Sequence, residues 1–177
     1  MKTVILISGV SGSGKDTYAL ELHDQLVDKG YNVQVLHNAH ALYGILEKHY
    51  GVTDYKSDLG KRIIMGCTDL LYEIDKHYFE KITEGNILDD TDVVIIPDWR
   101  YLNTYEYFYY THNKYKVHTV MIKRVDPRNC DGYLVGDNQV KERNLLHKLN
   151  PQVILYNKDL YSVKENIEEY IKDTLKL

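Results

Sequence analysis

Short apolar runs rich in β-branched residues alternate along the chain with longer stretches of helical periodicity. The apolar runs predict five strands, over Val4–Ser8, Asn32–Leu36, Val93–Pro97, Lys116–Lys123 and Gln152–Tyr156. The segment Val93-Val94-Ile95-Ile96 is apolar at every position, which is typical of a strand buried on both faces. Strands that alternate with helices favour an α/β fold, in which crossover helices connect the strands of a parallel sheet.

Helical spacing describes most of the segments between these strands. A first helix begins near Lys15, places Ala19, Leu22 and Leu26 on one face, and ends at Lys29-Gly30. Further helices are predicted over Ala39–Tyr50, over Ser57–Thr83 with Gly66 as a candidate break, and over Leu160–Leu175. The segments Tyr101–Tyr115 and Val125–Asp137 carry no clear pattern. No repeat, linker or low-complexity tract divides the sequence, so residues 1–177 are interpreted as a single domain.

A glycine-rich loop provides the most specific motif. The sequence Gly9-Val10-Ser11-Gly12-Ser13-Gly14-Lys15 follows the first predicted strand and opens the first predicted helix. This is the context that the phosphate-binding G-x-x-x-x-G-K-[ST] motif requires. Glycines let backbone N–H groups converge on phosphate oxygens, and the helix adds the positive end of its dipole. We therefore expect ATP to bind here, with Lys15 neutralising its β- and γ-phosphates, and the binding residues to be Gly12, Ser13, Gly14, Lys15, Asp16 and Thr17.

The residue after Lys15 departs from the general motif. Asp16 stands where a Ser or Thr hydroxyl normally binds magnesium, and Thr17 follows one position later. One residue turns a helical side chain by about 100°, so Thr17 does not simply replace that hydroxyl. Asp16 can hold Mg²⁺ directly or through water, as carboxylates do, or it can face the acceptor and orient the attacking group. The sequence leaves both roles open.

Asp98 and Arg100 directly follow the apolar strand that ends at Pro97. In an open parallel sheet, ligands lie beyond the carboxyl ends of the strands. We therefore expect Asp98 to organise the magnesium shell and Arg100 to fork onto a phosphate. The alternative interpretation is an Asp–Arg pair that closes the strand.

A second candidate group lies in the helical segment Lys61–Asp69. Arg62 and Asp69 are about two helical turns apart, so they can share a face. A cation at Arg62 can grip a phosphate that the acceptor already carries, while Thr68 or Asp69 bonds to its sugar or base. The alternative is a solvated face with a charge pair. On the first interpretation, the helical region of about 38–85 binds the acceptor.

Two arginines mark a candidate lid. Arg124 ends a predicted strand, and Arg128 lies in the polar stretch that follows it. A polar loop in this position, over about 124–140, is typical of a segment that closes over a bound substrate. Its cations would neutralise the phosphates and exclude water during transfer. The alternative is a pair of ordinary surface cations.

Composition narrows the range of partners. The formal net charge is -4 and the sequence pI is about 6.0, which argues against a polynucleotide ligand, since those sites need a basic surface. No stretch approaches the roughly 20 apolar residues that span a bilayer, so no membrane partner is expected. Cys67 and Cys130 form no CxxC pair and are interpreted as reduced thiols. The expected location is the cytoplasm, or the host cytoplasm for a viral protein.

Three of these segments together resemble the bacteriophage-type deoxynucleoside monophosphate kinases, a branch of the P-loop nucleotide kinases. They are Ser11–Thr17, Gly66-Cys67-Thr68-Asp69 and Asp98-Trp99-Arg100-Tyr101-Leu102-Asn103. The family's versions read roughly SGKDT, G-T-D or G-T-E, and D-x-R-x-x-N-E. Their order and separations agree along most of the chain. In this family an aspartate at the position of Asp16 is a regular feature.

The resemblance implies a three-layer P-loop kinase fold, with a five-stranded parallel sheet and helices on both faces. It implies that ATP and a deoxynucleoside monophosphate react to give ADP and the diphosphate, with Mg²⁺ as the cofactor. It also implies that Asn157, just after the last predicted strand, lies near the adenine of ATP. Small nucleotides are then the expected partners, and a homodimer is also considered.

The sequence departs from the family pattern at the acceptor side. Thr104 replaces the glutamate expected after Asn103, and Glu106 follows two positions later. The aspartate-rich lid motif is blurred around Asp131–Asp137, and a tryptophan expected after Asp75 is absent. These departures bear on the identity of the acceptor more than on the reaction.

Two other functions therefore stay open. The first is a kinase of another small phosphorylated metabolite, since the animal-type phosphomevalonate kinases share the Gly-Lys-Asp loop. The second is an ATP-binding module without turnover. A kinase that acts on polynucleotide ends is a weaker alternative, because the sequence lacks the positive balance that such a substrate needs.

Overall fold

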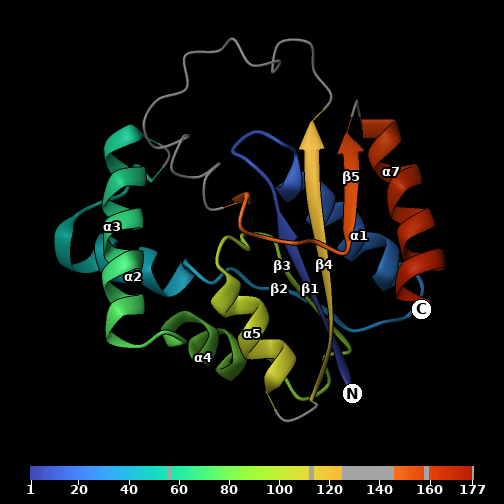
Figure 1. Cartoon of the computed structure of the whole chain (residues 1–177), viewed down its shortest axis with the longest axis horizontal. Helices are drawn as coiled ribbons and strands as arrows, with labels where there is room; N and C mark the ends of the chain where they lie inside the picture. The colour runs from blue at the N-terminus through green and yellow to red at the C-terminus, as the bar shows by residue number, and fades with distance from the viewer. Residues whose placement is uncertain (56, 112–113, 125–145, 158–159, 177) are drawn as a thin grey trace.

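A five-stranded, fully parallel sheet forms the centre of the molecule (Figure 1). The computed structural model describes residues 1–55, 57–111, 114–124, 146–157 and 160–176. The strand order is β2-β3-β1-β4-β5. The bounds are β1 Lys2–Ser8, β2 Val33–Val35, β3 Val93–Ile96, β4 Tyr115–Arg124 and β5 Val153–Asn157. All five strands expected from the sequence are confirmed.

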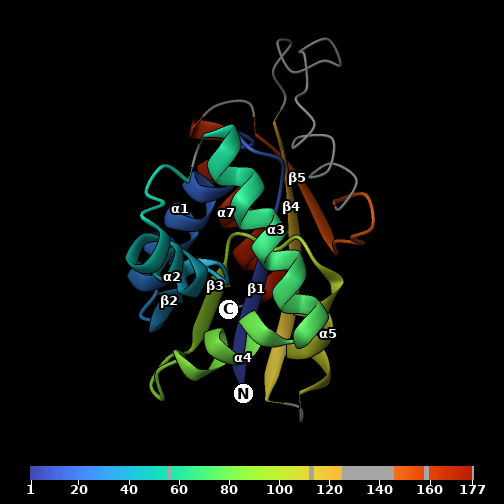
Figure 2. The same ribbon diagram turned by 90° about the vertical axis from the view of Figure 1, so that its left-hand side faces the viewer.

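Helices cover both faces of the sheet, which makes three layers. Helices α1 (Lys15–Asp28) and α7 (Leu160–Glu169) pack on one face, and α7 continues into the π-helix η2 (Tyr170–Leu175). Helix α5 (Leu102–Tyr110) packs on the other face. Helices α2 (His40–Tyr50), α3 (Asp58–Ile74) and α4 (Tyr78–Gly85) form a group at the side of the sheet, as Figure 2 shows face-on.

The central strands show the alternation that two covered faces require. Ile5 and Ile7 of β1 belong to the core beneath α1 and α7, whereas Val4 and Leu6 belong to the core beneath α5. Every residue of β3 is buried, as its continuous apolar sequence predicts. The α2–α4 group has a smaller apolar cluster of its own, around Leu42, Leu46 and Phe79.

The long helix predicted over Ser57–Thr83 is two helices, and the predicted break near Gly66 is wrong. Helix α3 continues through Gly66 to Ile74, and the chain turns at Asp75, whose backbone is extended at φ -143° and ψ 108°. The Asp75 carboxylate accepts a hydrogen bond from the His77 N–H at 3.0 Å and one from Lys81 Nζ at 2.6 Å. An aspartate that bonds locally to the backbone offers the chain an alternative to helix, which accounts for the break.

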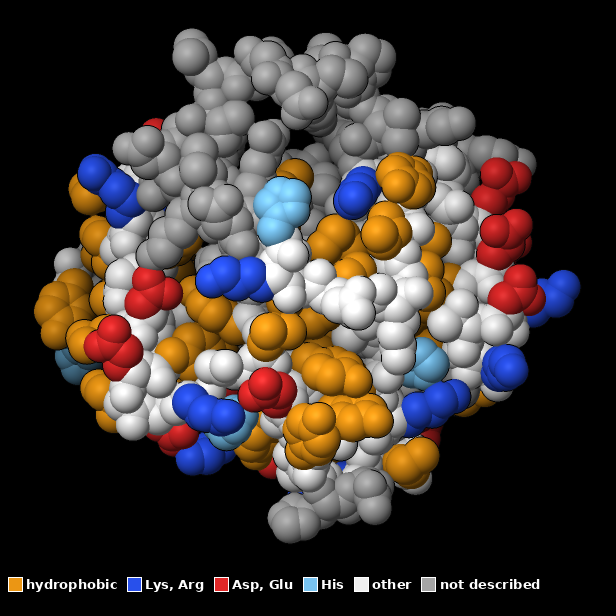
Figure 3. Space-filling view, viewed as in Figure 1, with side chains coloured by type: hydrophobic (Ala, Val, Ile, Leu, Met, Phe, Trp, Pro, Cys, Tyr) orange, Lys and Arg blue, Asp and Glu red, His pale blue; other side chains and the backbone are white. Residues whose placement is uncertain are grey.

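Helix α5 lies in a segment for which the sequence gave no clear pattern. Six of its nine residues are the aromatics and leucine of the sequence LNTYEYFYY, with Thr104 and Phe108 buried at helical spacing. Tyrosine hides the periodicity because it serves buried and exposed positions equally. Its exposed side chains include Tyr110, at 74% exposure. Figure 3 shows hydrophobic surface in its lower part, where α5 lies in Figure 1.

Two remaining expectations concern membrane-spanning helices and the predicted lid. Among the described residues, no helix has the length and apolarity that crossing a membrane demands. The predicted lid of about 124–140 lies outside the described residues, apart from Arg124 at the end of β4.

Two glycines of α3 should respond oppositely to alanine. A Cβ at Gly60 would overlap the carbonyl oxygen of Asp54, whereas a Cβ at Gly66 meets nothing within 4 Å. Gly66→Ala should raise the free energy of unfolding by about 0.5–1 kcal/mol, because alanine is the better helix former. Gly60→Ala should lower it by about 1–3 kcal/mol through overpacking. Urea denaturation of both variants measures the difference, and equal effects would contradict the described α3 packing.

His118 should make the stability depend on pH. Burial lowers the pKa of this imidazole, and the nearby Lys116 cation lowers it further. The unfolded chain then takes up a proton first, so stability should fall as pH drops through about 6.5. His118→Leu should flatten this slope between about pH 7.5 and pH 5.5, whereas His49→Gln, at an exposed position, should not. Denaturation midpoints across this range test it, and an unchanged slope in His118→Leu would refute the assignment.

Candidate functional site

The glycine-rich loop connects the carboxyl end of β1 to the first turn of α1. Gly12 and Gly14 have φ of 80° and 89°, in the left-handed region that glycine adopts without strain. Gly14 is the N-cap of α1, and its carbonyl accepts the Tyr18 N–H at 2.9 Å. The Ser13 N–H bonds back to the Val10 carbonyl at 3.0 Å, which tightens the turn. The backbone therefore has the curled form that the phosphate-binding motif predicts.

The loop is also held from the side by β5. Asn157, the last residue of β5, is buried and donates from Nδ2 to the Ser13 carbonyl at 3.4 Å. A Cβ at Gly14 would lie 3.0 Å from the same Nδ2. A Cβ at Gly9 would lie 2.8 Å from the Ile122 carbonyl, so β4 limits the loop from below. Asn157 thus supports the loop, and its predicted place near adenine stays a prediction.

Ser13 has a feature suited to an anion. Its hydroxyl is buried and finds no hydrogen-bond partner among the described residues. A buried donor without a partner is costly, and a phosphate oxygen or a water at the loop would satisfy it. Lys15 is half-buried at the first position of α1, whereas Asp16 and Thr17 are exposed.

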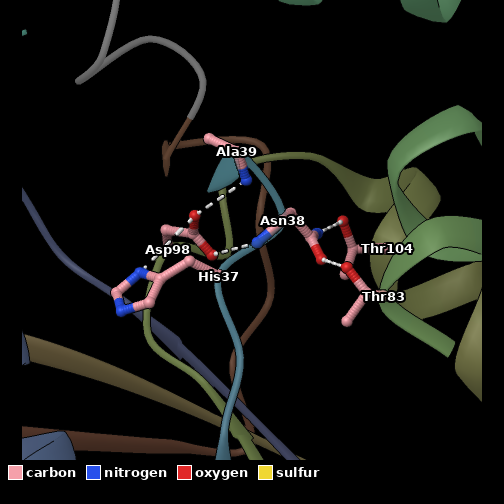
Figure 4. Close-up of polar contacts among 6 residues, drawn as sticks. All are labelled: His37, Asn38, Ala39, Thr83, Asp98 and Thr104. Carbon is pink, nitrogen blue, oxygen red and sulfur yellow. Dashed lines mark hydrogen bonds and ion pairs between the residues drawn. The ribbon is translucent and has the colours of Figure 1, made fainter. Parts of the chain in front are cut away.

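Asp98 lies just beyond β3, where its carboxylate faces the start of α2. Its Oδ1 accepts the Asn38 N–H at 3.4 Å and its Oδ2 accepts the Ala39 N–H at 3.5 Å, as Figure 4 shows. His37 Nδ1 lies 3.9 Å from Oδ2. The side chain keeps 17% exposure. Two backbone donors at a helix N-terminus therefore orient a carboxylate that still reaches solvent.

Tyr43 of α2 has a hydroxyl whose pKa responds to three predicted site residues. Burial raises the pKa of this hydroxyl, the Asp98 charge raises it further, the Arg100 cation lowers it, and Asp16 raises it. The Asp98 carboxylate also accepts the backbone N–H groups of Asn38 and Ala39 at the start of the same helix. The segment after β3 and the start of α2 are therefore in direct contact.

Asp69 of α3 is hydrogen-bonded to Tyr101, the residue after Arg100. The Tyr101 hydroxyl donates to Asp69 Oδ1 at 3.1 Å, and its ring lies 4.9 Å from that of Tyr72. Burial and the Asp69 carboxylate raise the pKa of Tyr101 well above its ordinary range, and the Arg100 cation opposes them. The Arg100 cation thus lowers the pKa of both Tyr43 and Tyr101.

The predicted magnesium ligands fit a hydrated divalent ion. Mg²⁺ usually binds one or two protein carboxylates and keeps several waters. Asp16 and Asp98 supply two carboxylates that act on the same tyrosine, one exposed and one half-buried. In the part of the chain that the structure describes, no group of three His, Cys, Asp or Glu side chains forms a protein-only metal cage.

The other predicted residues lie at varied distances from this centre. Arg62 exposes its side chain about two turns before Asp69 on α3, and Thr68 is half-buried on the same helix. Arg124 is paired in register with Asn157 at the ends of β4 and β5. Arg128 lies outside the described residues. Their roles remain predictions.

The sequence reasoning missed Tyr43, Tyr101 and Asn38. Tyr101 and Asn38 follow the carboxyl ends of β3 and β2, so the rule that placed Asp98 also covers them. Tyr43 carries no such signal, because it reaches the site only through the docking of α2.

The Tyr101 hydroxyl should contribute measurably to stability. Tyr101→Phe removes the donor to Asp69 and should lower the free energy of unfolding by about 1–2 kcal/mol, because the half-buried carboxylate loses a partner. Tyr110→Phe, at an exposed position of α5, is the matched control and should have almost no effect. Chemical denaturation compares them, and equal losses would show that the Tyr101–Asp69 bond contributes nothing specific.

One known family model matches the N-terminal part of the chain. A family model described as adenylylsulphate kinase matches residues 1–64, which include the glycine-rich loop, α1 and α2. No curated protein sequence matches the chain significantly.

Solved structures of two kinases share the whole fold. The Mycobacterium tuberculosis APS kinase in complex with AMPPNP and APS matches with a TM-score of 0.53 at 14% identity, over 97% of this chain and 96% of that chain. Shikimate kinase from Acinetobacter baumannii in complex with shikimate matches with a TM-score of 0.51 at 13% identity, over 99% of this chain and 94% of that chain. The protein has the three-layer α/β fold of the P-loop kinases.

Proposed function

We propose that the protein is a kinase that transfers the γ-phosphoryl group of ATP to a small phosphorylated metabolite, and that this acceptor is a deoxynucleoside monophosphate. The observation that carries the proposal is the curled glycine-rich loop at the N-terminus of α1, whose Ser13 hydroxyl is buried and without a hydrogen-bond partner among the described residues. The neighbouring strand β3 is followed by the Asp98 carboxylate and by Arg100, so a phosphate loop, a carboxylate and a guanidinium lie at one edge of the sheet, as phosphoryl transfer requires.

The donor side consists of the loop and α1. The loop N–H groups, the N-terminus of α1 and Lys15 would hold the β- and γ-phosphates. Lys15 begins the helix, so its ammonium can lie over phosphates held by the loop. Asp16 and Asp98 would hold Mg²⁺, which supplies positive charge to the phosphates when bound.

The acceptor side consists of the residues around Arg100. Its guanidinium can take an acceptor phosphate by two parallel hydrogen bonds. Tyr43 and Tyr101, whose hydroxyls both respond to the Arg100 charge, offer planar rings, and Asp69 offers a carboxylate for a sugar hydroxyl or a base amine. Rings, a cation and a polar acceptor suit a nucleotide better than an acceptor without a ring system. Arg62, Thr68 and the cations Arg124 and Arg128 are proposed to complete the site.

The reaction needs little chemistry from the protein. A monophosphate oxygen is already anionic at neutral pH, so in-line attack on the γ-phosphorus requires no general base. The protein then acts by positioning the two substrates and by stabilising charge.

Adenylylsulphate is a second candidate acceptor, because the family model over residues 1–64 carries that description. It is also a nucleotide, so its recognition would use the same rings. The remaining alternatives are a phosphomevalonate-type acceptor and ATP binding without turnover.

An acceptor panel tests the proposal directly. ADP formation from Mg·ATP should be stimulated by at least one of the four deoxynucleoside monophosphates, compared with the ribonucleotides, adenylylsulphate, phosphomevalonate and shikimate. Stimulation by adenylylsulphate alone would select the second candidate. ATP binding without stimulation by any acceptor would reject the kinase proposal.

Lys15→Ala should lower kcat for the best acceptor by about 10²- to 10³-fold, because a preorganised charge on the transferring phosphates is lost. Lys29→Ala, an exposed lysine just past the other end of the same helix, is the matched control and should keep full activity. Thermal unfolding should show both variants folded. A folded Lys15→Ala enzyme with ordinary kcat would contradict the assignment of the loop.

A further inference from the structure

A buried carboxylate lies behind the site, on α4. Glu80 has 0% exposure, and its Oε1 accepts hydrogen bonds from Tyr72 Oη at 2.8 Å and from Thr104 Oγ1 at 2.7 Å. Its Oε2 is buried and has no hydrogen-bond partner among the described residues. Burying a carboxyl group is costly unless its hydrogen bonds compensate, so this group has a strong influence on the donors around it.

The carboxylate determines the direction of the hydrogen bonds that lead away from it. The Thr104 hydroxyl donates its single proton to Glu80 Oε1. The Thr104 oxygen is then left to accept from Asn38 Nδ2, at 3.4 Å. The Asn38 Oδ1 accepts from the Thr83 hydroxyl at 2.7 Å, which fixes the amide in one orientation (Figure 4).

Asn38 connects this network to the candidate site. It is buried between the end of β2 and the start of α2, and its side chain is held by the α4 and α5 threonines. Its own N–H and that of Ala39 are the donors to the two oxygens of Asp98. The side chain that the threonines hold and a backbone donor to Asp98 thus belong to the same residue (Figure 4).

We propose that Glu80 is a positioning residue for Asp98, acting through Thr104 and Asn38. The inference rests on the proposed function, in which Asp98 serves phosphoryl transfer. It adds that the Asp98 carboxylate is oriented by a second carboxyl group, that of Glu80 on α4. The two are joined by one threonine and one asparagine, and neither linking side chain is exposed to solvent.

Thr104→Val tests the hydrogen bonds that connect Glu80 to Asn38 through the Thr104 hydroxyl. Valine keeps the shape of threonine but removes the donor to Glu80 and the acceptor for Asn38. We expect kcat to fall about 10-fold with the KM for ATP within about two-fold, because in the proposed function the loop and Lys15 supply most of the ATP affinity and the orientation of Asp98 matters most in the transfer step. Thr104→Ser retains the hydroxyl and should recover wild-type kcat. Glu80→Gln keeps an acceptor oxygen and should be milder than Glu80→Leu.

A double-mutant cycle separates positioning from general support of the fold. If Thr104 acts through Asp98, the Asp98→Asn/Thr104→Val enzyme should be no slower than Asp98→Asn alone, within about two-fold. Multiplicative losses would overturn the proposal. Thr91→Val is the matched control, because Thr91 is a buried threonine whose hydroxyl bonds to Gln34 at 2.6 Å, away from Asp98. It should leave kcat unchanged.

A readout independent of turnover keeps the inference distinct from the proposed function. The backbone amide resonances of Asn38 and Ala39 should shift in Thr104→Val and in Asp98→Asn, but not in Thr91→Val. Unmoved amides in Thr104→Val would refute the positioning role. If the wild-type protein forms no ADP with any acceptor but Thr104→Val and Asp98→Asn show these shifts, the kinase proposal is rejected and the Glu80–Asp98 linkage is retained.

Discussion

The hydrogen bond from the Trp99 N–H to the Ile7 carbonyl, at 3.1 Å, continues the β1–β3 ladder past the end of β3. It places the segment of Asp98 and Arg100 beside the point where β1 gives way to the glycine-rich loop. The buried Trp99 side chain locks this arrangement by packing into the core beneath α5. The carboxyl ends of β1 and β3 therefore lie side by side, and backbone pairing holds the segment after β3 against the end of β1.

The sheet and the phosphate loop were predictable because their signals are local. An apolar run such as Val93–Ile96 is enough to predict a buried strand, and glycines followed by Lys15 are enough to predict a phosphate-binding turn. The end of α3 was misplaced because Asp75, not Gly66, stops the helix, and a side chain that bonds to its own backbone looks like any surface carboxylate in sequence. Tyr43 and Glu80 owe their roles to tertiary docking alone. Nothing within a few residues of either distinguishes a site tyrosine or a buried glutamate from surface ones.

The two halves of the site are held by different forces. The phosphate loop stands on the large apolar core shared by the sheet, α1 and α7. The α2–α4 group has only a small cluster around Leu42, Leu46 and Phe79, and is joined to the rest by polar bonds to Glu80, Asp69 and Asp98. Regions with few buried apolar contacts open at lower free energy than the core does. A more rigid region around the glycine-rich loop and a more adaptable α2–α4 group follow from this difference.

The bond between Asn157 and the Ser13 carbonyl has a consequence for how the protein is made. It joins residues 144 positions apart, and β1 itself pairs only with β3 and β4, which come much later in the chain. Contacts of such long range form late, because the entropy cost of closing a large loop comes before the contacts stabilise the chain. During synthesis the glycine loop therefore emerges long before any of the strands that support it. A nascent or truncated chain would carry the complete motif and still lack the site.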